Sequence, residues 1–165
     1  MKTKSLFILS LSFMLSISSF AQNYTTGIGL RGSSFHAGSG GINLKHFIST
    51  QNALELTVGG GNNHLVGTLL YEWQNSTGIT PGLDWYIGAG GTVGSWRTNY
   101  VHPVHNNKTT YSSGFYLGGR AVIGLDYVIP GLPLNIAVDT GPYIGIINSN
   151  SFGWGGSFAI RYILN

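Results

Sequence analysis

Two groups of side chains in the sequence could carry chemistry, and both lie in polar segments rich in glycine, serine or asparagine. His36 and Ser39 lie three residues apart, and together with a carboxylate they would resemble the polar triad of a lipid A deacylase or acyltransferase. His102 and His105, with His64 as a third ligand, would suit zinc or copper. Neither spacing matches a defined motif, so we expect no enzyme activity, no cofactor and no bound metal.

The elements that would position these side chains are β-strands, because apolar and polar residues alternate along most of the chain after residue 22. Eight such stretches follow one another, separated by turn residues such as glycine, asparagine and proline. Their length of about ten residues matches a tilted strand that crosses a membrane. The even number of strands favours closure into a barrel, since lipid tolerates no unpaired strand edge.

Residues 1–21 are predicted to form a secretory signal peptide. Two lysines give it a basic start, the stretch up to residue 20 is apolar or small, and Ala21 offers cleavage before Gln22. A membrane-anchoring helix is the alternative, but the apolar core is short and no basic cluster follows it. Residues 22–165 are predicted to form one domain that is exported from the cytoplasm.

The composition is unusual for a soluble domain. Charged residues make up 8% of the chain, against about 25% in ordinary globular proteins. The chain contains 26 glycines, and 13% of its residues are aromatic, which suits a barrel with an outer face in lipid. It contains no cysteine, so we expect no disulfide and no thiolate metal site. After the signal peptide, the chain contains six basic and five acidic residues. This near balance gives no basic surface for nucleic acid.

The charged residues follow the strand alternation. All five acidic residues share a face with glycine, threonine and asparagine, and four basic residues fall on the same face. A soluble sandwich has the opposite arrangement, apolar inside and polar outside. We therefore predict an all-β fold, a single antiparallel eight-stranded up-and-down transmembrane barrel with a filled polar lumen. The predicted lumen charge network consists of Arg31, Lys45, Glu55, Glu72, Asp84, Arg120, Asp126, Asp139 and Arg161.

The predicted interior leaves little empty space. Tyr86, Tyr116 and Tyr143 point inward, and small barrels fill their interiors by alternating large and small residues. Eight strands enclose only enough room for side chains, so we expect no open pore. The inward glycines are Gly27, Gly29, Gly88, Gly90, Gly118 and Gly124.

Aromatic residues give the predicted barrel an orientation. Five of them are expected on the lipid face as a periplasmic aromatic girdle, namely Tyr24, Trp73, Trp85, Tyr127 and Tyr162. The turns expected in the periplasm are then those near 49–52, 75–82 and 129–133. The loops expected outside the cell are those near 35–40, 59–63, 97–113 and 148–152, of which 97–113 is the longest.

Short motifs follow one another along the predicted strands from about residue 42 to the end. They are Lys45-His46-Phe47, Asn52-Ala53-Leu54-Glu55, Leu70-Tyr71-Glu72-Trp73, Asp84-Trp85-Tyr86-Ile87-Gly88-Ala89-Gly90-Gly91, Gly124-Leu125-Asp126-Tyr127, Pro133-Leu134 and Ile160-Arg161-Tyr162. In this order they resemble the small, largely uncharacterised outer-membrane β-barrel family of the general OmpA/OmpX-like type. The resemblance implies an outer-membrane location and a barrel architecture, and it brings no catalytic residues.

The last strand is similar to the C-terminal signal read by the barrel-assembly machinery, although it ends in Leu164-Asn165 rather than in an aromatic residue. We therefore expect an outer-membrane protein with a structural or envelope role. Its expected partners are outer-membrane lipid, including lipopolysaccharide, and the barrel-assembly machinery, and the barrel is expected to be a monomer. Two alternatives stay open: a surface binding or adhesion module acting through 97–113, and a lipid A-modifying enzyme.

Overall fold

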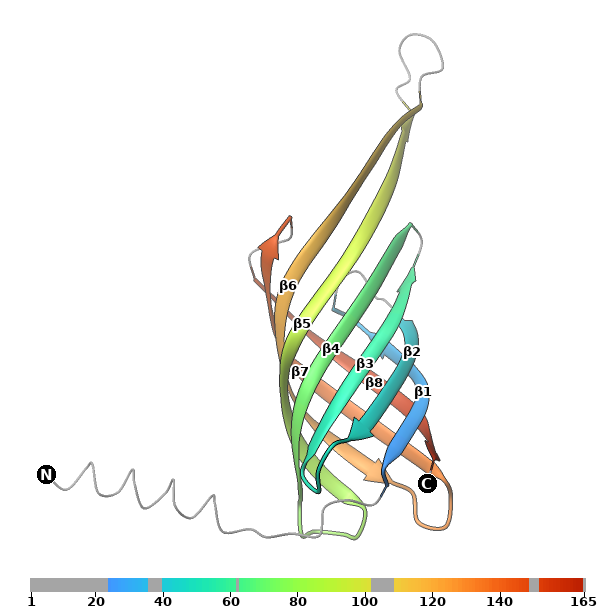
Figure 1. Ribbon diagram of the computed structural model, residues 1–165, viewed down its shortest axis with the longest axis vertical. Helices are drawn as coiled ribbons and strands as arrows, with labels where there is room; N and C mark the ends of the chain where they lie inside the picture. Colours follow the sequence, from blue (N-terminus) through green and yellow to red (C-terminus); the bar gives the residue numbers. More distant parts are fainter. Residues whose placement is uncertain (1–23, 36–39, 62, 102–108, 149–151, 165) are drawn as a thin grey trace, which may run out of the picture.

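The computed structural model describes residues 24–35, 40–61, 63–101, 109–148 and 152–164. They form eight strands: β1 (Thr26–Ser33), β2 (Gly40–Phe47), β3 (Asn52–Gly61), β4 (His64–Ser76), β5 (Leu83–Val101), β6 (Thr109–Val128), β7 (Leu134–Ile147) and β8 (Gly153–Leu164). Each strand pairs antiparallel with the next in the chain, and β1 pairs with β8, which closes the barrel (Figure 1). The predicted eight-stranded up-and-down barrel is thereby confirmed. The described residues contain no helix long and apolar enough to cross a membrane.

The barrel carries polar side chains inside and apolar side chains outside, as the alternation predicts. On β4, Thr68 and Glu72 are buried, while Leu69 and Trp73 between and beyond them are 52% and 45% exposed. On β8, Arg161 is buried between two outward neighbours. Because successive side chains of a strand point to opposite faces, one inward residue fixes the face of every other residue on the strand.

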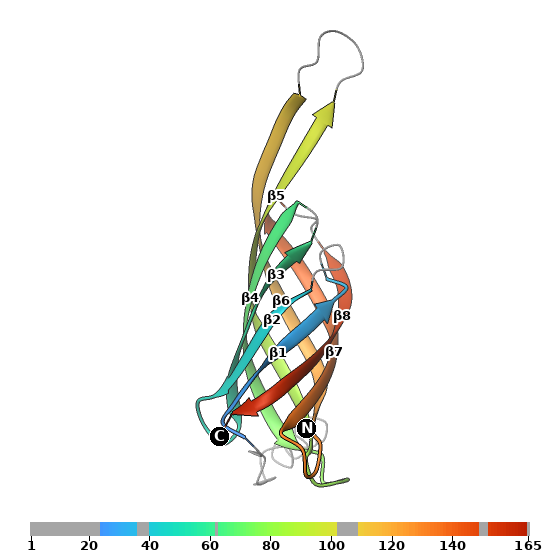
Figure 2. The same ribbon diagram turned by 90° about the vertical axis from the view of Figure 1, so that its right-hand side faces the viewer.

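Strands β5 and β6 are longer than the sequence analysis predicts. A loop is expected at 97–113, but β5 continues to Val101, which pairs with Thr109 at the start of β6. This prediction is wrong because the threonines, tyrosines and valine of this segment favour strand, and the pairing continues without interruption. The hairpin extends beyond the other strands (Figures 1 and 2). Its connection lies within 102–108, outside the described residues.

The start of β1 and the end of β8 lie at the same end of the barrel (Figure 2). The turns after β2, β4 and β6 lie at this end as well. In the turn before β5, Gly82 has a φ of 83°, and a Cβ there would lie 2.7 Å from the carbonyl oxygen of Val128. Glycine is therefore required at this close approach between two strands. We call the end of the barrel at which β1 starts and β8 ends the terminal end, and we call the opposite end the hairpin end.

Candidate functional site

The nine charged side chains of the predicted network all lie inside the barrel and are at most 7% exposed. Every strand contributes at least one of them. Four are basic and five are acidic, which leaves a formal charge of 4 − 5 = −1 in the lumen. Ions buried away from water are tolerated when they are paired and hydrogen-bonded, so the partners of each ion decide whether the interior is stable.

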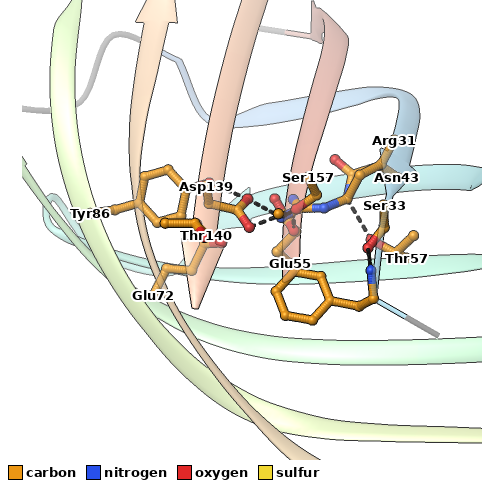
Figure 3. A network of polar contacts seen from close by, with 12 residues as sticks. Arg31, Ser33, Asn43, Glu55, Thr57, Glu72, Tyr86, Asp139, Thr140 and Ser157 are labelled. Atoms are coloured by element: carbon orange, nitrogen blue, oxygen red, sulfur yellow. Dashed lines mark hydrogen bonds and ion pairs between the residues drawn. The ribbon is translucent and has the colours of Figure 1, made fainter. Parts of the chain in front are cut away.

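Asp139 on β7 is the centre of the network toward the hairpin end (Figure 3). Its two oxygens accept hydrogen bonds from four side chains: Arg31, Tyr86 at 2.8 Å, Arg120 at 3.2 Å and Ser157 at 2.6 Å. Arg31 also donates to Glu55 on β3, the second strand from β1 in the sheet. The contacts therefore tie together strands that are not neighbours in the sheet.

Arg161 on β8 connects this part of the network to the part toward the terminal end. It donates to Glu55 on β3 and forms an ion pair with Asp126 on β6 at 3.4 Å. It also donates to the side-chain oxygens of Asn43 and of Asn135, the latter at 2.7 Å. One guanidinium group thus contacts residues from four other strands.

Lys45 on β2 is the cation nearest the terminal end of the network. Its ammonium group lies 2.8 Å from Glu72 and 3.0 Å from Asp126, and it donates to Gln74 at 2.6 Å. Gln74 in turn donates to Asp84 at 2.9 Å. Asp84 therefore joins the network through an amide rather than through a direct ion pair.

Tyr24 is the one member of the predicted girdle that the structure places on the wrong face. Its side chain is 4% exposed, its ring meets Phe47 edge-on with centroids 5.1 Å apart, and its hydroxyl donates to Asp126 at 3.4 Å. The prediction of a lipid-facing Tyr24 is wrong because β1 begins only at Thr26, so the strand alternation does not extend back to it. Tyr24 instead closes the lumen at the terminal end together with Phe47, Ala53 and Ile163.

The other four predicted girdle residues lie on the outward register near the terminal end. Trp73, Trp85 and Tyr162 are 45%, 36% and 53% exposed, and Tyr127 is half-buried. Trp73 also contacts Tyr71 edge-on. Indole and phenol groups at one level of an apolar surface are typical of the boundary between hydrocarbon and water.

The hairpin end of the lumen is covered by Phe35. This ring is 5% exposed, and the guanidinium carbon of Arg120 lies 3.7 Å from its centroid, a cation–π contact. Beneath it a cavity of about 20 Å³ is lined by Arg31, Thr68 and Arg120 among others. Such a space has room for about one water molecule. The filled polar lumen predicted from the sequence is therefore confirmed.

A structure comparison identifies a barrel with the same architecture. The N-terminal β-barrel domain of Pseudomonas aeruginosa OprF superimposes with a TM-score of 0.62, covering 87% of this chain and 99% of that one. The chain has the OprF barrel fold. Sequence identity is 16%, so the likeness concerns the fold, and for the fold it confirms the resemblance to small eight-stranded barrels. No protein-family model matches the sequence, and no curated protein matches it.

The interior of this OprF-like barrel depends on glycines that face tyrosine rings. A Cβ at Gly118 would lie 2.2 Å from the ring of Tyr143, and one at Gly124 would lie 2.6 Å from the ring of Tyr86. Real Cβ atoms do not approach other atoms this closely. The absence of a side chain at these positions is therefore what allows the tyrosines to lie across the lumen.

Replacing Gly124 with alanine is expected to lower the free energy of unfolding by about 1–3 kcal/mol, because the added methyl would overpack against Tyr86 and the Val138 carbonyl. Gly119→Ala is the matched control, since a Cβ there meets no atom within 4 Å. Both changes replace glycine with alanine, so they lower the conformational entropy of the unfolded chain equally. Urea unfolding in phosphatidylcholine vesicles measures the difference, and equal stabilities of the two variants would contradict the packing argument.

The catalytic and metal candidates from the sequence are not assembled among the described residues. His36, Ser39, His102 and His105 lie outside them. Within the described part of the chain, no three histidine, cysteine or acidic side chains are grouped closely enough to hold a metal ion.

Gln74 is an uncharged member of the network of the OprF-like barrel that the sequence analysis does not assign. Gln74, 1% exposed, bridges Lys45 and Asp84. Gln74 follows the buried Glu72 by two residues on β4. Because residues two apart on a strand point to the same face, the alternation of β4 indicates that Gln74 points inward.

Proposed function

We propose that this protein is a β-barrel of the bacterial outer membrane with a structural role in the cell envelope, and that it neither conducts ions nor carries out catalysis. The observation that carries the proposal is the inverted distribution of side chains. Among the described residues, all nine buried charges lie in the lumen, whereas 31 large hydrophobic side chains are at least 36% exposed. A monomer in water rarely exposes apolar patches beyond a few hundred Å², but lipid makes such a surface favourable.

The closed topology supports the same proposal. Each strand, β1 and β8 included, has two hydrogen-bonded neighbours, so the cylinder has no open strand edge. In hydrocarbon there is no water to pair with a free N–H or C=O group, and closure removes the edges that would present them.

The filled lumen favours a structural role over transport. Ion pairs from Arg31 to Glu55 and Asp139, and from Arg161 to Glu55 and Asp126, cross the interior at two levels. An ion that passed through would have to break several of these contacts at once. Each rupture leaves a buried charge without its partner, which costs several kcal/mol.

The decisive experiment is electrophoresis of membrane fractions with and without boiling. We expect the protein in the outer-membrane fraction, with the unboiled sample running at a different mobility because the closed barrel resists detergent. The boiled sample of the same preparation is the control. A protein with one mobility under both conditions, recovered from the soluble periplasm, would contradict the proposal. Discrete conductance steps in a planar bilayer would contradict the closed lumen while leaving the membrane location intact.

A further inference from the structure

A hollow of about 620 Å³ opens on the outer surface of β4, β5 and β6 near the hairpin end. Ser95 and Ser113 supply its small side chains, and Leu65 and Phe115 border it at 60% and 56% exposure. Arg97, also exposed, lies directly opposite Ser113 in the β5–β6 ladder. Asn63, His64, Trp96 and Gly114 complete its lining, so the hollow combines apolar and aromatic walls with hydroxyl, amide, imidazole and guanidinium groups.

Arg97 differs from the other charged residues of the described chain because its side chain is not buried in the lumen. Ten lysine, arginine, aspartate or glutamate residues fall within the described part of the chain, and the nine others are buried in the lumen. Arg97 is therefore the one charged side chain that the described barrel presents on its outward register. All acidic side chains of the described residues are buried in the lumen, so an anionic partner for Arg97 comes from outside the described barrel.

The position of Arg97 along the barrel axis indicates where that partner lies. Trp85 and Arg97 are both on the outward register of β5 and are separated by 97 − 85 = 12 residues. At about 3.3 Å per residue and a strand tilt of about 40°, they lie about 30 Å apart along the barrel axis. This equals the thickness of the hydrocarbon core, about 30 Å. With Trp85 at one lipid–water boundary, Arg97 is level with the phosphate groups at the other.

A shallow apolar surface leads from the hollow toward mid-depth. Directly below the hollow Val93 lies opposite Leu117, and the next two outward pairs of β5 and β6 are small: Gly91 lies opposite Gly119, and Ala89 lies opposite Ala121. A Cβ at Gly119 would meet no atom within 4 Å, so the surface there is open. A flexible hydrocarbon chain can lie along such a depression and gain contacts with the barrel.

We propose that this hollow binds one phosphorylated lipid of the outer leaflet, of the lipid A type. Arg97 donates to a lipid phosphate, which matches the planar guanidinium fork, while an acyl chain passes Phe115 and then Leu117 and Val93 before it runs over the small residues below. The apolar walls favour a lipid over free phosphate, which would gain nothing from them. This inference rests on the proposed outer-membrane location and names the lipid class that the barrel would hold.

Native mass spectrometry of the protein purified from membranes tests the proposal. The barrel is exchanged into detergent with equal amounts of diphosphorylated lipid A and of the same lipid without phosphates. We expect the wild-type protein to retain the phosphorylated form about fivefold or more over the other. Arg97→Ala should remove the preference, and Arg97→Lys should keep part of it.

A charge swap provides the matched variant. In Arg97→Ser combined with Ser113→Arg, the guanidinium group moves to the paired position on β6, at the same height and beside the same hollow. The swap should restore the preference that Arg97→Ala loses. Gly119→Leu fills the shallow surface without altering charge, and it should lower retention of both lipids alike.

Three results would overturn the inference. The first is a phosphate preference that persists in Arg97→Ala. The second is wild-type protein that retains both lipids equally. The third is displacement of bound lipid A by millimolar inorganic phosphate, which would make the hollow a site for free anions. Boiling-dependent gel mobility is recorded for each sample. A normal mobility shift without lipid preference rejects this inference alone, whereas loss of the shift in the wild type rejects the proposed function.

Discussion

Replacing Arg161 with methionine is expected to lower the free energy of unfolding by about 3–5 kcal/mol, the cost of leaving buried charges without their partner. Methionine is unbranched like the stem of arginine but cannot donate, so Glu55 and Asp126 would each lose a contact with this cation, and Asn135 would lose its 2.7 Å hydrogen bond. Reversible urea unfolding of the barrel in phosphatidylcholine vesicles, followed by tryptophan fluorescence, measures the change.

Arg97→Met is the matched control, since it removes an arginine from the outer surface instead of the lumen. It should change the stability by less than about 0.5 kcal/mol in vesicles that contain no anionic lipid. Combining Arg161→Met with Glu55→Gln should recover part of the loss, because it removes one of the two carboxylates that lost this cation, and Glu55 would otherwise keep only Arg31 as a partner. Equal unfolding midpoints for Arg161→Met and Arg97→Met would show that the lumen contacts contribute little.

An arginine introduced on the outer surface at mid-depth is expected to be nearly as destabilising. Leu69 pairs with Gly91, which lies six residues from both Trp85 and Arg97 and therefore near the middle of the apolar band. Leu69→Arg should cost about 2–4 kcal/mol in vesicles, because the charge is forced into hydrocarbon. The same urea titration measures it.

Ile79→Arg is the control for this change, because Ile79 is 81% exposed in the turn between β4 and β5. There the new arginine reaches water, so we expect an effect below about 0.5 kcal/mol. A barrel that folds in water would tolerate both substitutions alike, since both side chains are already exposed. Equal effects of the two variants would therefore count against a lipid-facing surface.

The sequence predicts the face of each strand residue because strand alternation has a period of exactly two residues, and one register error would reverse the whole strand. Lys45, Glu55 and Arg161 could for this reason be assigned to the lumen without a structure. The alternation says nothing outside a strand, and Tyr24 precedes β1, so its inward position could not be read in the same way. The extension of β5 to Val101 cannot be predicted from alternation alone, because polar residues in this segment are also typical of a loop.

Which charges pair inside the lumen could not be predicted either. Lys45 lies directly opposite Glu55 in the β2–β3 ladder, so proximity in the sheet would suggest that they form an ion pair. Instead Glu55 accepts from Arg31 and Arg161, and Lys45 contacts Glu72 and Asp126. Long side chains reach across the cylinder, and their partners depend on the curvature and stagger of all eight strands, which are properties of the closed barrel.

The place of Arg161 on the last strand has a consequence for the order of assembly. The partners of Arg161 lie on β2, β3, β6 and β7, and β8 also supplies the hydrogen-bonding neighbour for the edges of β1 and β7. A chain that lacks β8 would therefore bring both open edges and unneutralised carboxylates into the bilayer, where water can relieve neither. Insertion and closure should then be a single concerted event, with the first seven strands kept out of hydrocarbon until the eighth arrives.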